Sequence, residues 1–143
     1  MKPYRIINHT ADVGLKVNGL TLKELFENAA KGMFAIISGT EKDEDVKPVI
    51  RRGVEIREDA VALEELMVRW LSELLYLFNK ENILFDDFKV LELNGCGVAG
   101  EAYGEKINPE RKSLQTEIKA VTFHGLKIQK NSKDFSCNII FDV

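Results

Sequence analysis

Cysteine and tryptophan are scarce in this 143-residue chain, which has two cysteines and one tryptophan. Cys96 and Cys137 lie too far apart for a CxxC motif and have no nearby histidine, so they are interpreted as small buried apolar side chains. No apolar run approaches the length of a membrane span, and the N-terminus lacks the apolar core of a signal peptide. We therefore expect a cytoplasmic protein that has no membrane association.

The chain also lacks an excess of positive charge. Lysine and arginine total 20 against 23 aspartate and glutamate residues, which gives a net charge of −3 and a pI near 5.5. Strong direct binding of nucleic acid through bulk charge normally needs a basic surface. Any connection to RNA would therefore run through another protein.

What the chain does contain is typical of a globular protein, with 45% hydrophobic and 30% charged residues. It shows no internal repeat, low-complexity segment or linker, so residues 1–143 are predicted to form one domain. A chain of this length buries roughly two-thirds of the surface that it exposes when unfolded.

Two segments have the 3.6-residue apolar period of helices that lie on a core. The first begins at a capping box formed by Thr21 and Glu24 and ends at residues 38–40. The second follows Asp59, which is a candidate N-cap. The apolar positions are Leu22, Leu25, Phe26, Ala29, Ala30, Met33, Phe34 and Ile37 in the first segment, and Leu63, Leu66, Met67, Trp70, Leu71, Leu74, Leu75 and Phe78 in the second.

Strands are predicted on both sides of these helices. Asn94-Gly95 is a favoured two-residue hairpin turn, and the polar residues 130–134 are expected to join two late strands. The predicted strands cover residues 4–7, 15–17, parts of 46–58, 85–93, 98–103, 115–129 and 135–141. This order predicts an α+β fold with two helices packed on a mixed or mostly antiparallel sheet.

The most polar short stretch, residues 9–14, lies between the first two predicted strands. It contains His9, Thr10 and Asp12 just before Gly14. We expect Asp12 to meet the other end of the chain, where Asp142 stands beside the α-carboxylate of Val143. If the last two strands pair through residues 130–134, residue i faces residue 264 − i.

That register places Asp142 opposite Thr122, with Glu117 a few residues beyond. Several carboxylates in a small volume repel one another unless a cation neutralises them. An all-oxygen site of this kind suits Mg²⁺, Ca²⁺ or Mn²⁺ better than zinc. The candidate ligands are Asp12, Asp142, Val143 and Glu117.

His9 and His124 lack the spacing of a helical metal pair but could orient a carboxylate from the outer shell of the site. Lys119 is open to two readings, as a cation of the site or as a charge that protects an edge strand. The simpler alternatives also stand: Asp12 could hydrogen-bond its own turn, and Asp142 could be a solvated chain end. The sequence contains no nucleophile elbow, Cys/His dyad with a third member, or P-loop, so it gives little support for an enzyme.

Taken together, the motifs of the chain resemble those of the archease family. The resemblance spans essentially the whole chain, and Phe123 stands where the family usually has tyrosine. The residues that carry it are His9-Thr10-Ala11-Asp12-Val13-Gly14, the helix from Leu22 to Ala30, Tyr103-Gly104-Glu105, Glu117-Ile118-Lys119-Ala120-Val121-Thr122-Phe123-His124 and Asp142-Val143.

This resemblance implies an accessory protein rather than an enzyme. Archeases work with the RtcB-type RNA ligase of tRNA splicing and RNA repair, promoting guanylylation of the ligase histidine so that the ligase turns over many times. The family carries a metal site, for which Asp12, Asp142 and Val143 match, with Glu117 as a further acidic residue. Two alternatives remain: a chaperone-like modulator of a tRNA methyltransferase, and a metal-dependent phosphohydrolase.

Overall fold

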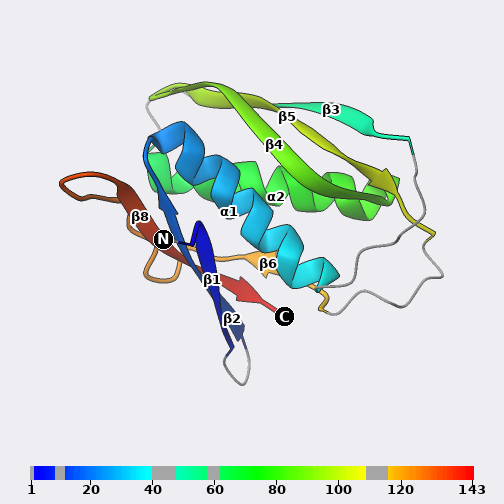
Figure 1. The fold of residues 1–143 in the computed structure, drawn as a ribbon, viewed down its shortest axis with the longest axis horizontal. Coiled ribbons are helices and arrows are strands. Elements are labelled where there is room, and N and C mark those ends of the chain that lie inside the picture. Colours follow the sequence, from blue (N-terminus) through cyan, green and yellow to red (C-terminus); the bar gives the residue numbers. More distant parts are fainter. Residues whose placement is uncertain (1, 9–11, 40–47, 58–61, 109–115) are drawn as a thin grey trace.

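The computed structural model describes residues 2–8, 12–39, 48–57, 62–108 and 116–143. Figure 1 shows the order of the elements along the chain. The bounds are β1 Tyr4–Asn8, β2 Asp12–Gly19, α1 Leu22–Ser38, β3 Ile50–Arg57, α2 Leu63–Glu81, β4 Ile83–Asn94, β5 Gly97–Lys106, β6 Ala120–Val121, β7 Gln129–Lys130 and β8 Phe135–Asp142.

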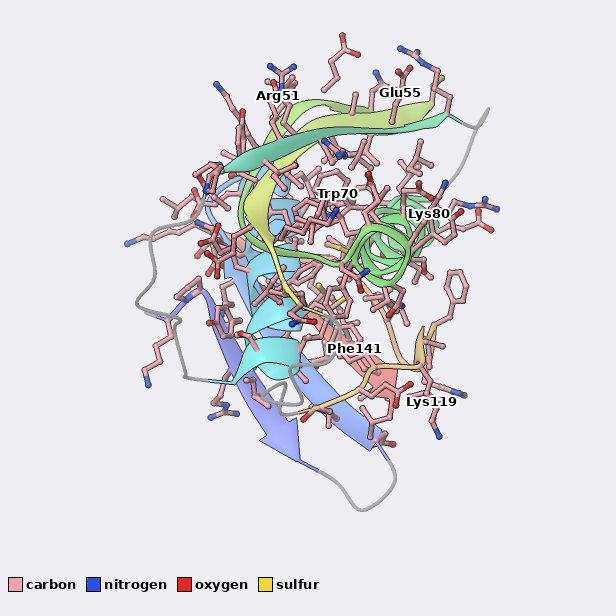
Figure 2. All side chains as sticks on the ribbon, turned by 90° about the vertical axis from the view of Figure 1, so that its right-hand side faces the viewer. Arg51, Glu55, Trp70, Lys80, Lys119 and Phe141 are labelled. Atoms are coloured by element: carbon pink, nitrogen blue, oxygen red, sulfur yellow. The ribbon has the colours of Figure 1, made fainter. Side chains whose placement is uncertain are left out.

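The described strands form two separate sheets with the helices between them (Figures 1 and 2). One sheet has the order β1-β2-β8-β6, with β7 also pairing with β8, and the other has the order β3-β5-β4. Every described pairing is antiparallel. The predicted α+β class, with two helices on mostly antiparallel strands, is confirmed; the division into two sheets is an addition to it.

Helix α1 lies in the middle layer and contacts both β2 and β4. Its N-cap Thr21 accepts a hydrogen bond from the Glu24 amide (3.1 Å), which confirms the predicted cap. In an ideal capping box the carboxylate of Glu24 would accept a hydrogen bond from the backbone amide of Thr21. Here it accepts from the backbone amide of Leu20 instead (3.4 Å).

Helix α2 packs beside α1 through the side chain of Trp70, which is fully buried. Its indole Nε1–H donates to the carbonyl of Phe26 in α1 (3.1 Å), so the one polar atom of this large side chain is satisfied inside the core. The residue at the N-cap of α2 is Ala62, which makes no side-chain capping bond. The candidate cap Asp59 lies outside the described residues.

The turn between β4 and β5 is shifted by one residue from the prediction. Asn94 pairs with Gly97, so the two turn residues are Gly95 and Cys96 rather than Asn94 and Gly95. The Asn94 side chain accepts a hydrogen bond from the Cys96 amide (2.8 Å), and this local bond holds Asn94 at the end of its strand.

The long strand predicted over residues 115–129 is wrong in its described part, residues 116–129. Two short pairings with β8 replace it: Ala120 faces Asp142, and Gln129 faces Ser136. From Ala120 to Gln129 the chain advances nine residues, whereas their partners Asp142 and Ser136 on β8 are six residues apart. Three extra residues therefore loop out, and a turn closed by a bond from the Leu126 amide to the Phe123 carbonyl (3.1 Å) takes up part of this excess.

None of the helices in the described part of the chain is long and apolar enough to cross a membrane.

Candidate functional site

The first residue of β2 and the last residue of β8 lie directly opposite each other. Asp12 pairs with Asp142 in the antiparallel register of these central strands. Directly opposite residues have Cβ atoms about 4.5–5.5 Å apart and project from the same face of a sheet. The expectation that the two ends of the chain meet is therefore confirmed.

The face that carries the two aspartates is the one turned away from the helices. The alternate residues of the same strands are in the core, with Val13, Leu15, Ile139 and Phe141 all under 8% exposed. Because side chains alternate across a strand, Asp12 and Asp142 project outward from the layer that the helices cover. In Figure 2 Phe141 points toward the helices from the five-stranded sheet.

One oxygen of Asp12 is in an unusual environment for a carboxylate. Asp12 Oδ1 is buried and accepts no hydrogen bond from any residue that the structure describes, whereas Asp142 is exposed. A buried acceptor left unpaired costs roughly 1–3 kcal/mol, and more when the group is charged. Like charges directly opposite each other in a sheet destabilise it further. Both costs would be removed by a cation that both carboxylates coordinate.

The register between β6 and β8 differs from the predicted one by two residues. Asp142 faces Ala120, not Thr122, because two offsets combine: Gln129 rather than Ile128 faces Ser136, which is one residue from the predicted register, and three residues then loop out between β7 and β6 in the opposite sense. Thr122 instead binds Ile140, donating both its amide (3.0 Å) and its hydroxyl (2.9 Å) to the Ile140 carbonyl. The prediction therefore placed Asp142 beside the wrong partner, although a shift of two residues keeps the same faces of the two strands together.

The remaining predicted residues lie around this pair in different ways. Lys119 contributes its backbone amide, which donates to the Asp142 carbonyl (2.8 Å), and its side chain is exposed. Glu117 is exposed, and so is His124, whose amide donates to the Thr122 hydroxyl (3.3 Å). Val143 is half-buried against the edge of the core. His9 lies outside the described residues.

Within residues 12–39, 116–143 and the other described ranges, no three histidine, cysteine, aspartate or glutamate side chains come close enough to hold a metal ion together. The structure therefore joins Asp12 to Asp142 but does not add Glu117 as a third side chain. The donor set that fits a hard cation here is two carboxylates, one with an unpaired buried oxygen. The ligand roles of all four predicted residues stay predictions.

A second group of residues on the same outer face was not predicted from the sequence. Arg5 pairs with Lys16 and Lys16 with Asn138, while Ile7 pairs with Gly14 and Gly14 with Ile140. These residues line a hollow of about 340 Å³. Alternation along each strand could have put Arg5, Lys16 and Asn138 on one face, but nothing in the sequence shows that their strands are neighbours.

Comparisons with known proteins agree with this architecture. The model of the archease protein family matches residues 4–143. The chain belongs to the archease family. The archease of Sulfolobus acidocaldarius is 36% identical over 144 residues, with 100% of both chains covered. That of Methanosarcina acetivorans is 39% identical over 146 residues, covering 99% of this chain and 97% of the relative.

Solved structures show the same archease fold. The solution structure of protein 1598 of Methanobacterium thermoautotrophicum has a TM-score of 0.78 and 34% identity, with 100% of both chains covered. A crystal structure from Thermotoga maritima, described as an archease and possible chaperone, has a TM-score of 0.64 and covers 96% of this chain and 94% of its own. At 20% identity, the second comparison supports the fold alone.

Proposed function

We propose that this archease-family protein is a metal-binding accessory protein that activates an RtcB-type RNA ligase by promoting guanylylation of the ligase histidine and multiple turnover. The observation that carries the proposal is the pair of opposed aspartates, Asp12 and Asp142, with the buried Asp12 Oδ1 left without a hydrogen bond from the described part of the chain. Family membership supports the choice of partner.

Asp12 and Asp142 would hold the cation, with the α-carboxylate of Val143 as a further candidate. Calcium, magnesium and manganese suit carboxylate oxygens, and a divalent cation of this kind neutralises phosphate charge during phosphoryl and nucleotidyl transfer. The chain's own contribution is to fix two carboxylates at the outer end of a sheet. There the backbone bond from Lys119 to Asp142 holds the end of β8 in place.

The activity test mixes the purified protein with the RtcB-type ligase of the same organism, GTP, a divalent cation and cleaved RNA, and counts ligated molecules per ligase. Wild-type protein should raise this count above one. Asp12→Asn and Asp142→Asn should leave the count near one, because each removes a carboxylate charge while keeping the side-chain shape.

Asp86→Asn is the matched control, since Asp86 is an exposed aspartate on β4 in the other sheet. It should stimulate the ligase as the wild type does. If Asp12→Asn restores multiple turnover at the wild-type level, or if wild-type protein gives no stimulation, the proposal is wrong.

The two alternatives make different predictions in the same preparation. A modulator of a tRNA methyltransferase would bind that enzyme and leave ligase guanylylation unchanged. A phosphohydrolase would release phosphate from nucleotides or cyclic phosphates without any ligase. Assays of the isolated protein and of the methyltransferase mixture therefore separate all three functions.

A further inference from the structure

The outer face of the five-stranded sheet carries three successive rows of side chains that run across the strands. The rows follow from the register: Arg5, Lys16 and Asn138 form the first, Ile7, Gly14 and Ile140 the second, and Asp12 with Asp142 the third. Rows two residues apart are separated by about 7 Å along the strands. A cationic row, an apolar row and an acidic row therefore lie within about 14 Å.

The cationic row is unfavourable for the isolated protein. Arg5 and Lys16 are exposed and directly opposite each other, and like charges in this position destabilise a sheet. Neither side chain has an ion-pair partner in the part of the chain that the structure describes. Two adjacent unpaired cations beside the Asn138 amide form a site complementary to a carboxylate or phosphate.

The apolar row is hollow because its centre is a glycine. Ile7 and Ile140 flank Gly14, and the hollow of about 340 Å³ lies over these residues. A Cβ at position 14 would lie 3.5 Å from both Ile140 Cδ1 and Ile7 Cβ, an ordinary contact distance. The backbone therefore tolerates a Cβ there, and Gly14 lies at the floor of the hollow between the two isoleucine side chains.

We infer that this face docks an extended segment of a partner protein that carries a carboxylate and an apolar side chain two residues apart. The carboxylate would pair with Arg5 and Lys16, and the apolar side chain would occupy the hollow above Gly14. Because residues i and i+2 of an extended chain lie about 7 Å apart on one face, the segment matches the spacing of the rows. The acidic row would repel the carboxylate of a segment bound the other way round. The carboxylate therefore lies over Arg5 and Lys16 rather than over Asp12 and Asp142.

Two other classes of ligand fit this face less well. RNA would bring further phosphates against Asp12 and Asp142, and the chain as a whole carries a net charge of −3. A small molecule would meet only the floor formed by β1, β2 and β8, whereas small-molecule sites bury most of their ligand. An extended protein segment needs only a face of this shape.

This inference rests on the proposed function for the identity of the partner, the RtcB-type ligase. Docking here would place the Asp12–Asp142 pair at the edge of the contact. The two roles then separate: the cationic and apolar rows set affinity, and the aspartates act after binding.

The test measures the dissociation constant of the full-length protein for the full-length ligase, together with ligase turnover at saturating protein. Lys16→Glu and Gly14→Val should each raise the dissociation constant at least tenfold, and turnover at saturation should return to the wild-type level. Asp12→Asn should show the opposite pattern, with binding kept and turnover lost.

Lys106→Glu is the control of equal charge, because Lys106 is an exposed lysine of β5 in the other sheet. Lys16→Gln is a milder second variant, and circular dichroism verifies the fold of each protein. If Lys16→Glu and Lys16→Gln bind as tightly as Lys106→Glu, the docking surface is wrong even though the proposed function stands.

A labelled RNA without ligase completes the experiment. Binding of this RNA by the wild type, lost in Lys16→Glu, would assign the surface to nucleic acid and overturn the inference. If wild-type protein neither binds nor stimulates the ligase, the proposed function and the docking surface both fail.

Discussion

At the scale of single residues, Asp12 is in an environment that lowers the stability of the isolated protein. Its buried Oδ1 accepts no hydrogen bond from the residues that the structure describes, and its carboxylate faces that of Asp142 across two paired strands. A residue selected for stability alone would be neutral here or would have a donor beside it. The unpaired oxygen is therefore the strongest residue-level sign of a cation site.

A stability measurement tests this reading without any ligase. In chelator, Asp12→Asn should be at least as stable as the wild type, because it relieves the repulsion from Asp142. With Ca²⁺, Mg²⁺ or Mn²⁺ at about a hundred times the dissociation constant, the wild type should gain about 2.7 kcal/mol. Asp12→Asn should gain little, and Asp86→Asn should gain as much as the wild type. Equal thermal shifts in wild type and Asp12→Asn would contradict a cation at this pair.

The two cysteines should differ sharply in reactivity. Cys96 is exposed in the β4–β5 turn, so the prediction that it is buried is wrong; the prediction is confirmed for Cys137, which is 4% exposed and whose burial raises the pKa of its thiol to about 12. A disulfide reagent at neutral pH should therefore label one thiol in the native protein and a second only after denaturant is added. Rapid labelling of both thiols in the native protein would contradict the burial of Cys137.

The same burial makes stability depend on pH in the alkaline range. The pKa of the Cys137 thiol is raised from its ordinary value of 9.0 to about 12, so between these values the folded chain keeps a proton that the unfolded chain has lost. The free energy of unfolding should fall above pH 9 by up to about 1.4 kcal/mol per pH unit from this group. Denaturant titrations of wild type and Cys137→Ala should differ by this slope, and parallel curves would contradict it.

At the scale of elements, glycines permit close backbone approach in the three-stranded sheet. Gly97 begins β5, and a Cβ there would lie 2.1 Å from the Ile56 carbonyl oxygen of β3, with φ at +154°. Gly53, in β3 of the same sheet, would place a Cβ in open space. The two positions therefore make a matched pair for testing the sheet.

Gly97→Ala should lower the free energy of unfolding by roughly 2–4 kcal/mol, because the new methyl group meets backbone that has no room to shift. Gly53→Ala should leave stability unchanged or raise it by up to about 1 kcal/mol, since it reduces the freedom of the unfolded chain. Urea unfolding followed by Trp70 fluorescence measures both. A Gly97→Ala protein as stable as Gly53→Ala would show that β3 and β5 pair differently.

At the scale of the whole molecule, the two sheets share one pair of helices. Helix α1 contacts both β2 and β4, and α2 contacts β3, β5 and β6. Neither sheet can lose its helices without exposing the apolar face of the other. We therefore expect the two halves to unfold together as one cooperative unit.

Two probes lie in different layers and test this cooperativity. Trp70 reports on the helices and the three-stranded sheet, because it lies against Gly100 of β5. Cys137 belongs to β8 in the five-stranded sheet. Fluorescence of Trp70 and labelling of Cys137 should give the same denaturant midpoint. A lower midpoint for Cys137 would show that the five-stranded sheet opens separately.

The sequence alone determined the two helices and most of the strands, but not the long strand predicted over residues 115–129. The 3.6-residue period located α1 and α2, and Thr21 marked the start of α1, because these signals depend on neighbours within one turn of the chain. The predicted partner of Asp142 was wrong by two residues, a shift that keeps the same faces of the two strands together.

Only the tertiary structure decided which strands are neighbours. The pairing of β1 with β2 and of β2 with β8 creates both the Asp12–Asp142 pair and the hollow beside Arg5 and Lys16. Local sequence specifies that a strand has an apolar face, but many partners can cover that face equally well. The choice among them depends on the fit of the whole core, and so does the looping out of three residues between β6 and β7.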